Sequence, residues 1–199
     1  MEYGLLVDVK KYKCFPTVIG EFKYDMPSVC EELIKFKSSK VFSQTEDDIH
    51  LLSEFKLFKD IVLSATDKYL KDLEYIYDSL EITGMWANAM HGGETHAPHT
   101  HSNNLMSGVY YLKASKDTAP IQFFDPRAQA HILSPRKKYN WDNSNMIQFN
   151  SVKGVGLLFP SWLQHWVPPA KESRISFSWN ILIRGKYGET DNALQNANI

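Results

Sequence analysis

The chain has 199 residues and a formal net charge of −1, with 22 Lys or Arg residues against 23 Asp or Glu residues. Its 43% hydrophobic and 23% charged residues are typical of a folded domain, which excludes disorder over the whole length. The balanced charge disfavours nucleic-acid binding, and no apolar run is long enough for a membrane span. We therefore expect one domain over residues 1–199 in the reducing cytoplasm, because the two cysteines fit neither a disulfide scaffold nor a zinc ribbon.

Residues 1–80 combine short strand-like segments with helical periodicity. The segments GLLVDVK (residues 4–10) and PTVIGEF (16–22) are typical of edge strands, and SVCEELIKFK (28–37) is typical of a helix. Between Leu52 and Tyr77, apolar residues recur at intervals of three, four and seven, which predicts a longer helix over residues 46–80. We expect these helices to support one face of a β-rich core.

From residue 80 onward, short β segments alternate with turn signals. The predicted strands cover residues 81–90, 106–114, 119–126, 130–135, 146–152, 154–160, 164–170 and 174–185. Eight short strands at this spacing are typical of an antiparallel sandwich or jelly roll. The predicted fold is therefore mainly β, a jelly-roll core over residues 80–185 with the N-terminal helices on one face. Residues 186–199 form a polar tail.

Histidine provides the clearest functional signal, because four of the seven histidines lie in HGGETHAPHTH, residues 91–101. On a strand, His99 and His101 would point to the same face and could reach one metal ion. His165 follows an apolar strand and could supply a third ligand. Imidazole suits iron, zinc, copper and nickel, and three ligands leave coordination positions open. The alternative is a set of solvated histidines on a polar loop.

A second candidate site lies nine residues after His165, where Arg174 and Ser176 face the same side of a predicted strand. Their guanidinium and hydroxyl groups can hold a carboxylate, and an Arg inside a barrel needs such a partner because an unpaired buried charge is costly. Tyr111 is a third candidate for this carboxylate pocket. Tyr110 and Tyr111 must face opposite ways, so we expect only one of them to be internal.

With these motifs in this order, residues 80–185 resemble the double-stranded β-helix of iron(II)- and 2-oxoglutarate-dependent oxygenases, the prolyl-hydroxylase-like branch in particular. That family has an HxD pair, a strand ending in Tyr-Leu, a distal His, and an Arg or Lys about nine residues further on. Here HTH (99–101), GVYYL (108–112), His165 and Arg174 match these positions. The sequence context is most similar to the small oxygenases of phages and marine bacteria.

The resemblance implies an Fe(II) cofactor and 2-oxoglutarate as cosubstrate. The implied metal ligands are His99, His101 and His165, and the implied cosubstrate contacts are Arg174, Ser176, Tyr111 and Asn88. The implied reaction is hydroxylation of an unidentified small-molecule or peptidyl substrate, with decarboxylation of 2-oxoglutarate to succinate. No catalytic residue is expected beyond the metal site, and a homodimer is the working hypothesis for assembly.

One departure from the family pattern is that His101 replaces the carboxylate ligand of the usual two-His, one-carboxylate triad. Three neutral imidazoles leave the metal one charge more positive, which bears on metal preference and on turnover. Asp125 and Asp142 are stand-in carboxylates elsewhere in the sequence, and neither occupies the matching position. Two alternatives stay open: a cupin-type three-His dioxygenase, which would not explain Arg174 and Ser176, and a non-catalytic jelly-roll module with a structural metal. In that module His96 or His91 would supply a fourth ligand.

Overall fold

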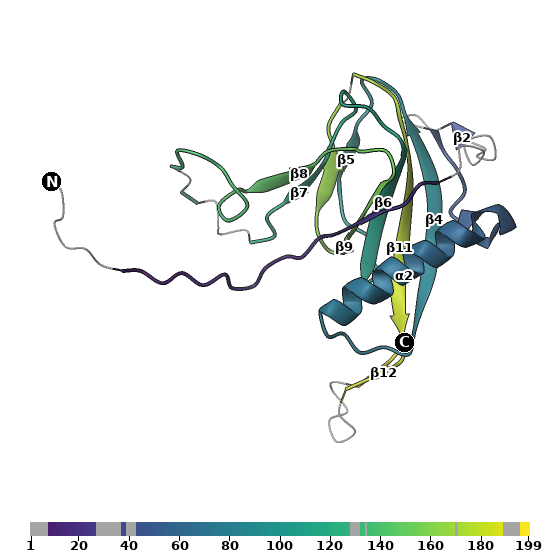
Figure 1. The fold of residues 1–199 in the computed structure, drawn as a ribbon, viewed down its shortest axis with the longest axis horizontal. Coiled ribbons are helices and arrows are strands. Elements are labelled where there is room, and N and C mark those ends of the chain that lie inside the picture. Colours follow the sequence, from purple (N-terminus) through teal and green to yellow (C-terminus); the bar gives the residue numbers. More distant parts are fainter. Residues whose placement is uncertain are drawn as a thin grey trace.

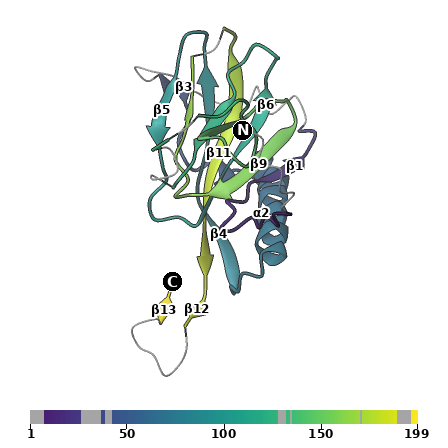
Figure 2. The same cartoon turned by 90° about the vertical axis from the view of Figure 1, so that its left-hand side faces the viewer.

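A computed structural model describes residues 8–26, 37–38, 43–127, 132–133, 135–169, 171–188 and 196–199. Two antiparallel sheets face each other and form the β-sandwich (Figures 1 and 2). The larger sheet has the order β1 (Gly20–Lys23), β9 (Val155–Pro160), β6 (Met106–Lys113), β11 (Arg174–Arg184), β4 (Ser79–Met90), β3 (Ser43–Gln44) and β2 (Lys37–Ser38). The smaller sheet has the order β5 (His96–His99), β10 (His165–Val167), β7 (Ile121–Phe124) and β8 (Met146–Phe149). The short strands β12 (Lys186–Tyr187) and β13 (Ala197–Asn198) pair near the C-terminus.

The long central strand β11 explains how the larger sheet separates an apolar core from a polar pocket. Its neighbours β4 and β6 pair with it on both sides, so it lies in the interior of the sheet. Successive side chains point to opposite faces. Phe177, Trp179 and Ile181 lie in the main apolar core, whereas Arg174 and Ser176 are buried polar residues in the alternating positions. The polar side of β11 faces the smaller sheet and provides the floor of the candidate site described below.

The helix α2 (Lys56–Asp72) covers the apolar face of the larger sheet (Figure 1). Its buried residues Phe58, Val62, Thr66 and Leu70 recur every four positions and form a single stripe. The ring of Phe58 packs 5.2 Å from that of Phe177, measured between ring centroids. The prediction of helices supporting one face is thus confirmed for α2. Among the described residues, no helix is long and apolar enough to cross a lipid bilayer.

The predicted helix over residues 46–80 is wrong at both ends. Residues 46–55 instead contain two 3₁₀ turns, η1 (Ile49–Leu51) and η2 (Ser53–Phe55), separated by Leu52 in an extended conformation. At the other end, Glu74 adopts a positive φ of 60° and the N–H of Tyr75 donates to the carbonyl of Leu70 at 3.0 Å. This arrangement terminates an α-helix. The chain then enters β4 at residue 79, so apolar periodicity alone overestimated the helix.

Other predicted elements are corrected by the structure or lie outside the described residues. Residues 8–10 are not in a strand, and of the predicted edge strand 16–22 only residues 20–22 are, within β1. The predicted helix over residues 28–37 and residues 4–7 lie outside the described residues, apart from Lys37 in β2. Residues 132, 133 and 135 are not in a strand, and the rest of the predicted strand 130–135 is not described. Strand β5 was not predicted, because its sequence HAPH contains Pro and polar residues typical of a loop.

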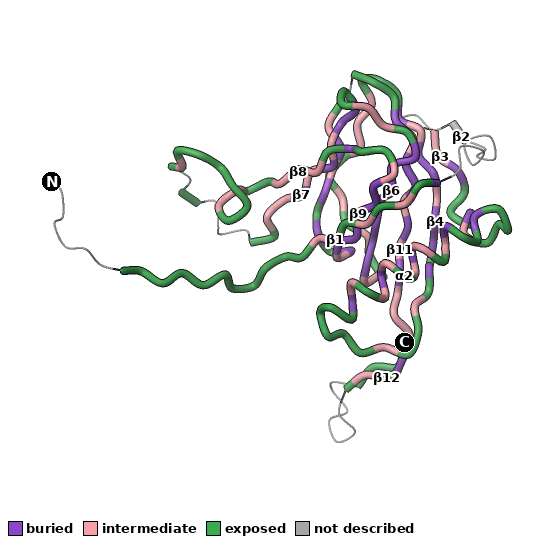
Figure 3. The backbone as a smooth tube through the Cα atoms, viewed as in Figure 1, coloured by how far each residue is buried: buried purple, intermediate pink, exposed green. Residues whose placement is uncertain are grey.

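Burial follows the central strands of the larger sheet and the inner side of α2, whereas residues 8–17 are exposed throughout (Figure 3). Gly108, on β6, lies at a very close approach in this core. A Cβ atom added to Gly108 would lie 2.3 Å from the ring of Trp179 and 2.7 Å from the carbonyl oxygen of Leu157. Backbone cannot move aside as a flexible side chain can, so this position requires glycine.

We expect Gly108→Ala to lower the free energy of unfolding by about 1–3 kcal/mol or more, because overpacking a filled core displaces rings and backbone. The matched control is Gly84→Ala on β4, where an added Cβ would find its nearest neighbour at 3.6 Å, an ordinary contact. Chemical denaturation followed by circular dichroism measures both variants. Equal stability of the two variants would show that the contact with Trp179 does not constrain the core.

Candidate metal and cosubstrate site

The structure brings together the three histidines that the sequence singled out. His99 ends β5 and lies opposite His165, the first residue of β10, in the antiparallel pairing of the two strands. His101 lies between β5 and the turn that begins at Ser102, and its backbone N–H donates to the carbonyl of Ser161 at 2.9 Å. One potential ligand atom from each ring lies within 4.8 Å of the other two. The strand pairing and the turn together therefore assemble a triad from two distant segments of the chain.

Backbone carbonyls orient two of these rings. Nδ1 of His99 lies 2.7 Å from the carbonyl oxygen of Ala97, and Nδ1 of His165 lies 2.9 Å from that of Leu163. A carbonyl oxygen can only accept, so both Nδ1 atoms carry the proton and both Nε2 atoms keep a free lone pair. Such a contact is the usual way in which a protein fixes the tautomer of a metal-ligating histidine.

The protonation states also suit metal binding. Burial lowers the pKa of His165 to about 3 and that of His101 to about 4, with the neighbouring imidazoles adding to both effects. Both rings are therefore neutral at neutral pH, which is the form that binds a metal. Two metal–nitrogen bonds of about 2.1 Å span at most about 4.2 Å. Small rotations within the 4.8 Å limit bring all three nitrogens into range.

Arg174 is the most unusual charge in the structure because it is buried, with 5% of its surface exposed, and lacks an anionic partner among the described residues. Its Nη1 donates to the carbonyl of Ala119 and to Oγ of Ser151, both at 3.3 Å, and its Nη2 contacts Sδ of Met90 at 3.4 Å. No carboxylate in the described part of the chain forms an ion pair with it. Burial lowers the pKa of its guanidinium, and Tyr111 opposes that effect.

Tyr111 is fully buried beside this guanidinium, whose central carbon lies 5.6 Å from the ring centroid. Its hydroxyl makes no well-aligned hydrogen bond, although Arg174 and Ser151 lie near enough to oppose the rise in its pKa that burial causes. Tyr110 faces the other way, as expected, but it is also buried. Only Tyr111 is therefore inside the sandwich, as expected, whereas Tyr110 is buried on the opposite face of the larger sheet, beneath α2.

Two further predicted contacts occupy the same row of the larger sheet. Ser176 pairs in register with Tyr111 on one side and with Asn88 on the other. Its hydroxyl has no hydrogen-bond partner and only 1% of the residue is exposed. The Asn88 amide donates to Oγ of Ser178 at 3.3 Å, whereas its Oδ1 oxygen has no partner. This row therefore presents unsatisfied polar atoms inside the sandwich, where such atoms normally find a partner.

A cavity of about 30 Å³ joins the metal triad to the Arg174 pocket. All three histidines, Arg174 and Asn88 line it, whereas Tyr111 and Ser176 are not among its lining residues. This volume holds about two water molecules. A five-carbon diacid is larger, so its binding requires lining side chains to move.

Two neighbours of the site were not among the predicted site residues, although His96 was named as a fourth ligand in the non-catalytic alternative. His96 lines the cavity and stacks on His99 with ring centroids 4.2 Å apart, and burial lowers its pKa to about 4. Its place in the histidine-rich segment was the available signal. Ser151, which accepts from Arg174, had no such signal. The two carboxylates considered as stand-in ligands are engaged elsewhere, Asp125 with Arg127 at 2.7 Å and Asp142 with Lys13 at 2.9 Å.

The fold is a jelly-roll core in which three converging histidines lie beside a buried arginine, and comparisons with known proteins find the same fold in oxygenases. Residues 84–180 match a family model described as "Putative 2OG-Fe(II) oxygenase", where 2OG is 2-oxoglutarate. This span runs from β4 to β11 and contains all seven predicted site residues. A comparison with curated protein sequences finds no match.

Solved structures share the fold at low sequence identity. A prolyl-4-hydroxylase from Pseudomonas putida has a TM-score of 0.60 at 13% identity, over 85% of this chain and 94% of that one. A 2OG-Fe(II) oxygenase family oxidoreductase from Burkholderia pseudomallei has a TM-score of 0.59 at 11% identity, over 77% and 74%. The viral collagen prolyl hydroxylase of Paramecium bursaria Chlorella virus-1, in its 2-oxoglutarate complex, has a TM-score of 0.53 at 13% identity, over 82% and 94%. The predicted resemblance to prolyl-hydroxylase-like 2OG-Fe(II) oxygenases is therefore confirmed, and so is the predicted jelly-roll fold.

Proposed function

We propose that this chain is a non-haem Fe(II)- and 2-oxoglutarate-dependent dioxygenase that holds the metal with His99, His101 and His165. The observation that carries the proposal is a buried Arg174, without an anionic partner among the described residues, in the same cavity as three converging imidazoles. Three imidazoles alone would suit a structural metal, and a buried Arg alone would suit any small anion. Together they fit a ligand that has a metal-chelating end and a carboxylate end, as 2-oxoglutarate does.

The guanidinium of Arg174 would receive the far carboxylate. Its present partners are neutral acceptors at 3.3–3.4 Å, which leave its positive charge uncompensated in a buried place. A carboxylate can accept two parallel hydrogen bonds from a guanidinium, and such charge-assisted bonds are stronger than neutral ones. The unpartnered Nε of Arg174 is a further donor for the same group.

The unpaired polar atoms of the neighbouring row support the same pocket. The hydroxyls of Tyr111 and Ser176 can donate to a carboxylate near Arg174, and the buried Tyr111 stays protonated because its pKa is raised. Asn88 lies on the next strand and also lines the cavity beside the histidines, where its free Oδ1 can accept from a ligand or a water. These residues would orient the cosubstrate and keep bulk water out.

Iron held by the three histidines would supply the activation of oxygen that couples decarboxylation of 2-oxoglutarate to succinate with hydroxylation of a second substrate. The residues of this chain contribute position, charge and exclusion of water. With three neutral imidazoles, the protein ligands add no negative charge to the metal, so the chelating carboxylate of the cosubstrate would be the anionic group among the proposed ligands. We propose that this makes cosubstrate affinity unusually dependent on the metal being present.

The substrate is proposed to be a peptidyl group or a small molecule. Among fold neighbours, one prolyl hydroxylase from Trichoplax adhaerens is in complex with a peptide fragment, and HygX from Streptomyces hygroscopicus is bound to hygromycin B. We further propose one domain over residues 1–199 and a cytoplasmic homodimer as the working unit.

The test is an anaerobic calorimetric titration of 2-oxoglutarate into Fe(II)-loaded protein, followed by admission of oxygen and measurement of succinate. We expect saturable binding, and slow succinate formation even without the second substrate. Glutarate, which keeps both carboxylates and lacks the keto group, is the matched control and should bind much more weakly because it cannot chelate through that group. Absence of 2-oxoglutarate binding at millimolar concentration would refute the proposal and favour a metal-binding module without turnover.

A further inference from the structure

A groove on the described surface lies outside the metal cavity and has a volume of about 1070 Å³. One wall is the N-terminal arm, defined here as residues 8–19, which runs away from the sandwich in an extended conformation (Figure 1). The other wall is the β7–β8 hairpin, whose described residues are 121–127, 132–133 and 135–149. Phe15, Trp141 and Trp162 line the groove with 92%, 67% and 56% of their surfaces exposed. Exposed aromatic residues gathered in one groove mark a binding surface.

The groove adjoins the candidate metal site through the turn between β9 and β10. Trp162 and Leu163 of this turn line the groove. On its other side, the carbonyl of Ser161 accepts from the N–H of His101, and the carbonyl of Leu163 accepts from Nδ1 of His165. One turn thus forms the end of the groove and supports two of the three proposed ligands.

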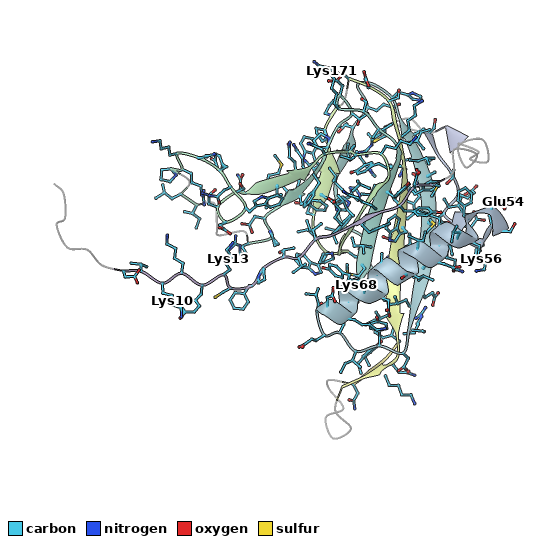
Figure 4. The ribbon with its side chains drawn as sticks, viewed as in Figure 1. Lys10, Lys13, Glu54, Lys56, Lys68 and Lys171 are labelled. Atoms are coloured by element: carbon cyan, nitrogen blue, oxygen red, sulfur yellow. The ribbon has the colours of Figure 1, made fainter. Side chains whose placement is uncertain are left out.

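The charge of the two walls is opposite in sign to that of the whole chain, whose formal net charge is −1. Basic residues outnumber acidic ones in both walls, and Figure 4 shows Lys10 and Lys13 extending from the arm. Ion pairs neutralise Asp142 through Lys13 and Asp125 through Arg127. Of the remaining basic residues, Lys11 lines the groove itself, and Lys10, Arg136, Lys137 and Lys138 lie elsewhere in the same two segments; the remaining acidic residue is Asp8. Nη1 of Arg136 is also buried without a hydrogen-bond partner.

The groove also includes a strand at the edge of the smaller sheet. Strand β8 is the last strand of the smaller sheet, with β7 as its only neighbour among the described strands, and Met146 and Ile147 from β8 line the groove. An edge strand presents backbone N–H and C=O groups that can pair with another extended chain. Adding a peptide as a further strand is a recurrent mode of recognition, with affinity from main-chain hydrogen bonds.

We propose that this groove binds an extended, acidic polypeptide segment, which would be the second substrate of the oxygenase proposed above. The apolar floor and the edge strand fit a polypeptide, and the basic walls select acidic side chains. A nucleic acid fits less well, because the edge strand β8 offers backbone groups that pair with a peptide backbone, which a sugar–phosphate chain lacks. This inference rests on the proposed function only for the hydroxylation of the bound segment. The binding of the segment itself needs no metal.

The test uses fluorescein-labelled dodecapeptides of alternating Glu and Val, or of alternating Lys and Val, and a single-stranded RNA dodecamer. Anisotropy is recorded with the full chain in EDTA and again after metal loading. We expect the acidic peptide to bind at least about tenfold more tightly than the basic one, a preference that high salt reduces because exposed charges are screened. The affinity for the acidic peptide should be the same in EDTA, where no metal is bound. A failure of metal or cosubstrate binding would therefore leave this result unchanged, so the two tests can fail separately.

Two variants locate the binding surface. We expect the double variant Lys10→Glu, Lys11→Glu and the single variant Trp141→Ala each to weaken the acidic peptide about fivefold or more. Lys171→Glu is the matched control, because Lys171 is exposed and lies on the sandwich away from the arm (Figure 4), and it should change affinity little. Equal binding of both peptides, preference for the RNA, or an equal effect of Lys171→Glu would each overturn the proposal.

Discussion

Replacing His165 with Ala is expected to lower Fe(II) affinity at least about 100-fold while the fold stays intact. Loss of an outer partner of a metal ligand already costs about 10–100-fold, and loss of a ligand costs more. The ring of His165 lies beside those of His99 and His101, with centroids 4.3 Å and 5.2 Å away. The remaining pair of imidazoles would hold the metal weakly. Anaerobic calorimetry with Fe(II), and with Zn²⁺ as a redox-inert substitute, measures the loss.

Thermal unfolding provides a second readout for the same variant. A ligand at about 100 times its dissociation constant stabilises the folded state by about 2.7 kcal/mol, which raises the melting temperature of a chain of this size by roughly 5–10 °C. We expect metal to raise the melting temperature of the wild type and not that of His165→Ala. His91→Ala is the control, because His91 is an exposed histidine of the same segment that lies outside the triad. If His91→Ala loses metal binding as fully as His165→Ala does, the triad is wrongly assigned.

Replacing Arg174 with Ala is expected to weaken 2-oxoglutarate binding at least about tenfold and to leave metal affinity nearly unchanged. A hydrogen bond to a charged group contributes roughly 1.5–3 kcal/mol, and about 1.4 kcal/mol corresponds to a factor of ten. Arg174 is not among the potential metal-ligand residues, so the two affinities should separate. Anaerobic titration of 2-oxoglutarate into the metal-loaded variant measures the change.

The control for this change lies on the same strand. Arg184 ends β11, is half-exposed and pairs with Glu81 at 2.5 Å, so Arg184→Ala removes the same side chain outside the pocket. We expect Arg184→Ala to bind 2-oxoglutarate as the wild type does. Arg174→Lys should recover only part of the affinity, because an ammonium keeps the charge without the planar pair of donors. Undiminished binding in Arg174→Ala would refute the pocket.

Much of the core could be predicted from the sequence because strand patterns are local. Seven of the eight strands predicted after residue 80 have counterparts in the structure, and β11 shows the expected alternation of Arg174 and Ser176 with core residues. The spacing of His99, His101, His165 and Arg174 along the chain was sufficient to predict the candidate site. Each of these signals lies within a few residues of sequence, where side-chain periodicity and residue chemistry are sufficient.

The rest depended on contacts between distant segments. Helix α2 is shorter than its apolar pattern, because residues 46–55 form 3₁₀ turns and residues 79–80 pair into β4. Strand β5 exists because its HAPH sequence pairs with β10, which overrides its weak strand propensity. The burial of Tyr110 required α2 on the second face of the sheet.

For the site itself, the sequence determined which side chains are available: three imidazoles, one guanidinium, and hydroxyl and amide groups on alternating strand positions. Only the tertiary structure decided that the imidazoles converge within 4.8 Å, that Arg174 is buried without a carboxylate among the described residues, and that His96 and Ser151 join them. The physical reason is that residue chemistry is a local property. Burial and convergence instead depend on how sheets pair and pack, which hydrogen bonds and apolar contacts decide across the whole chain.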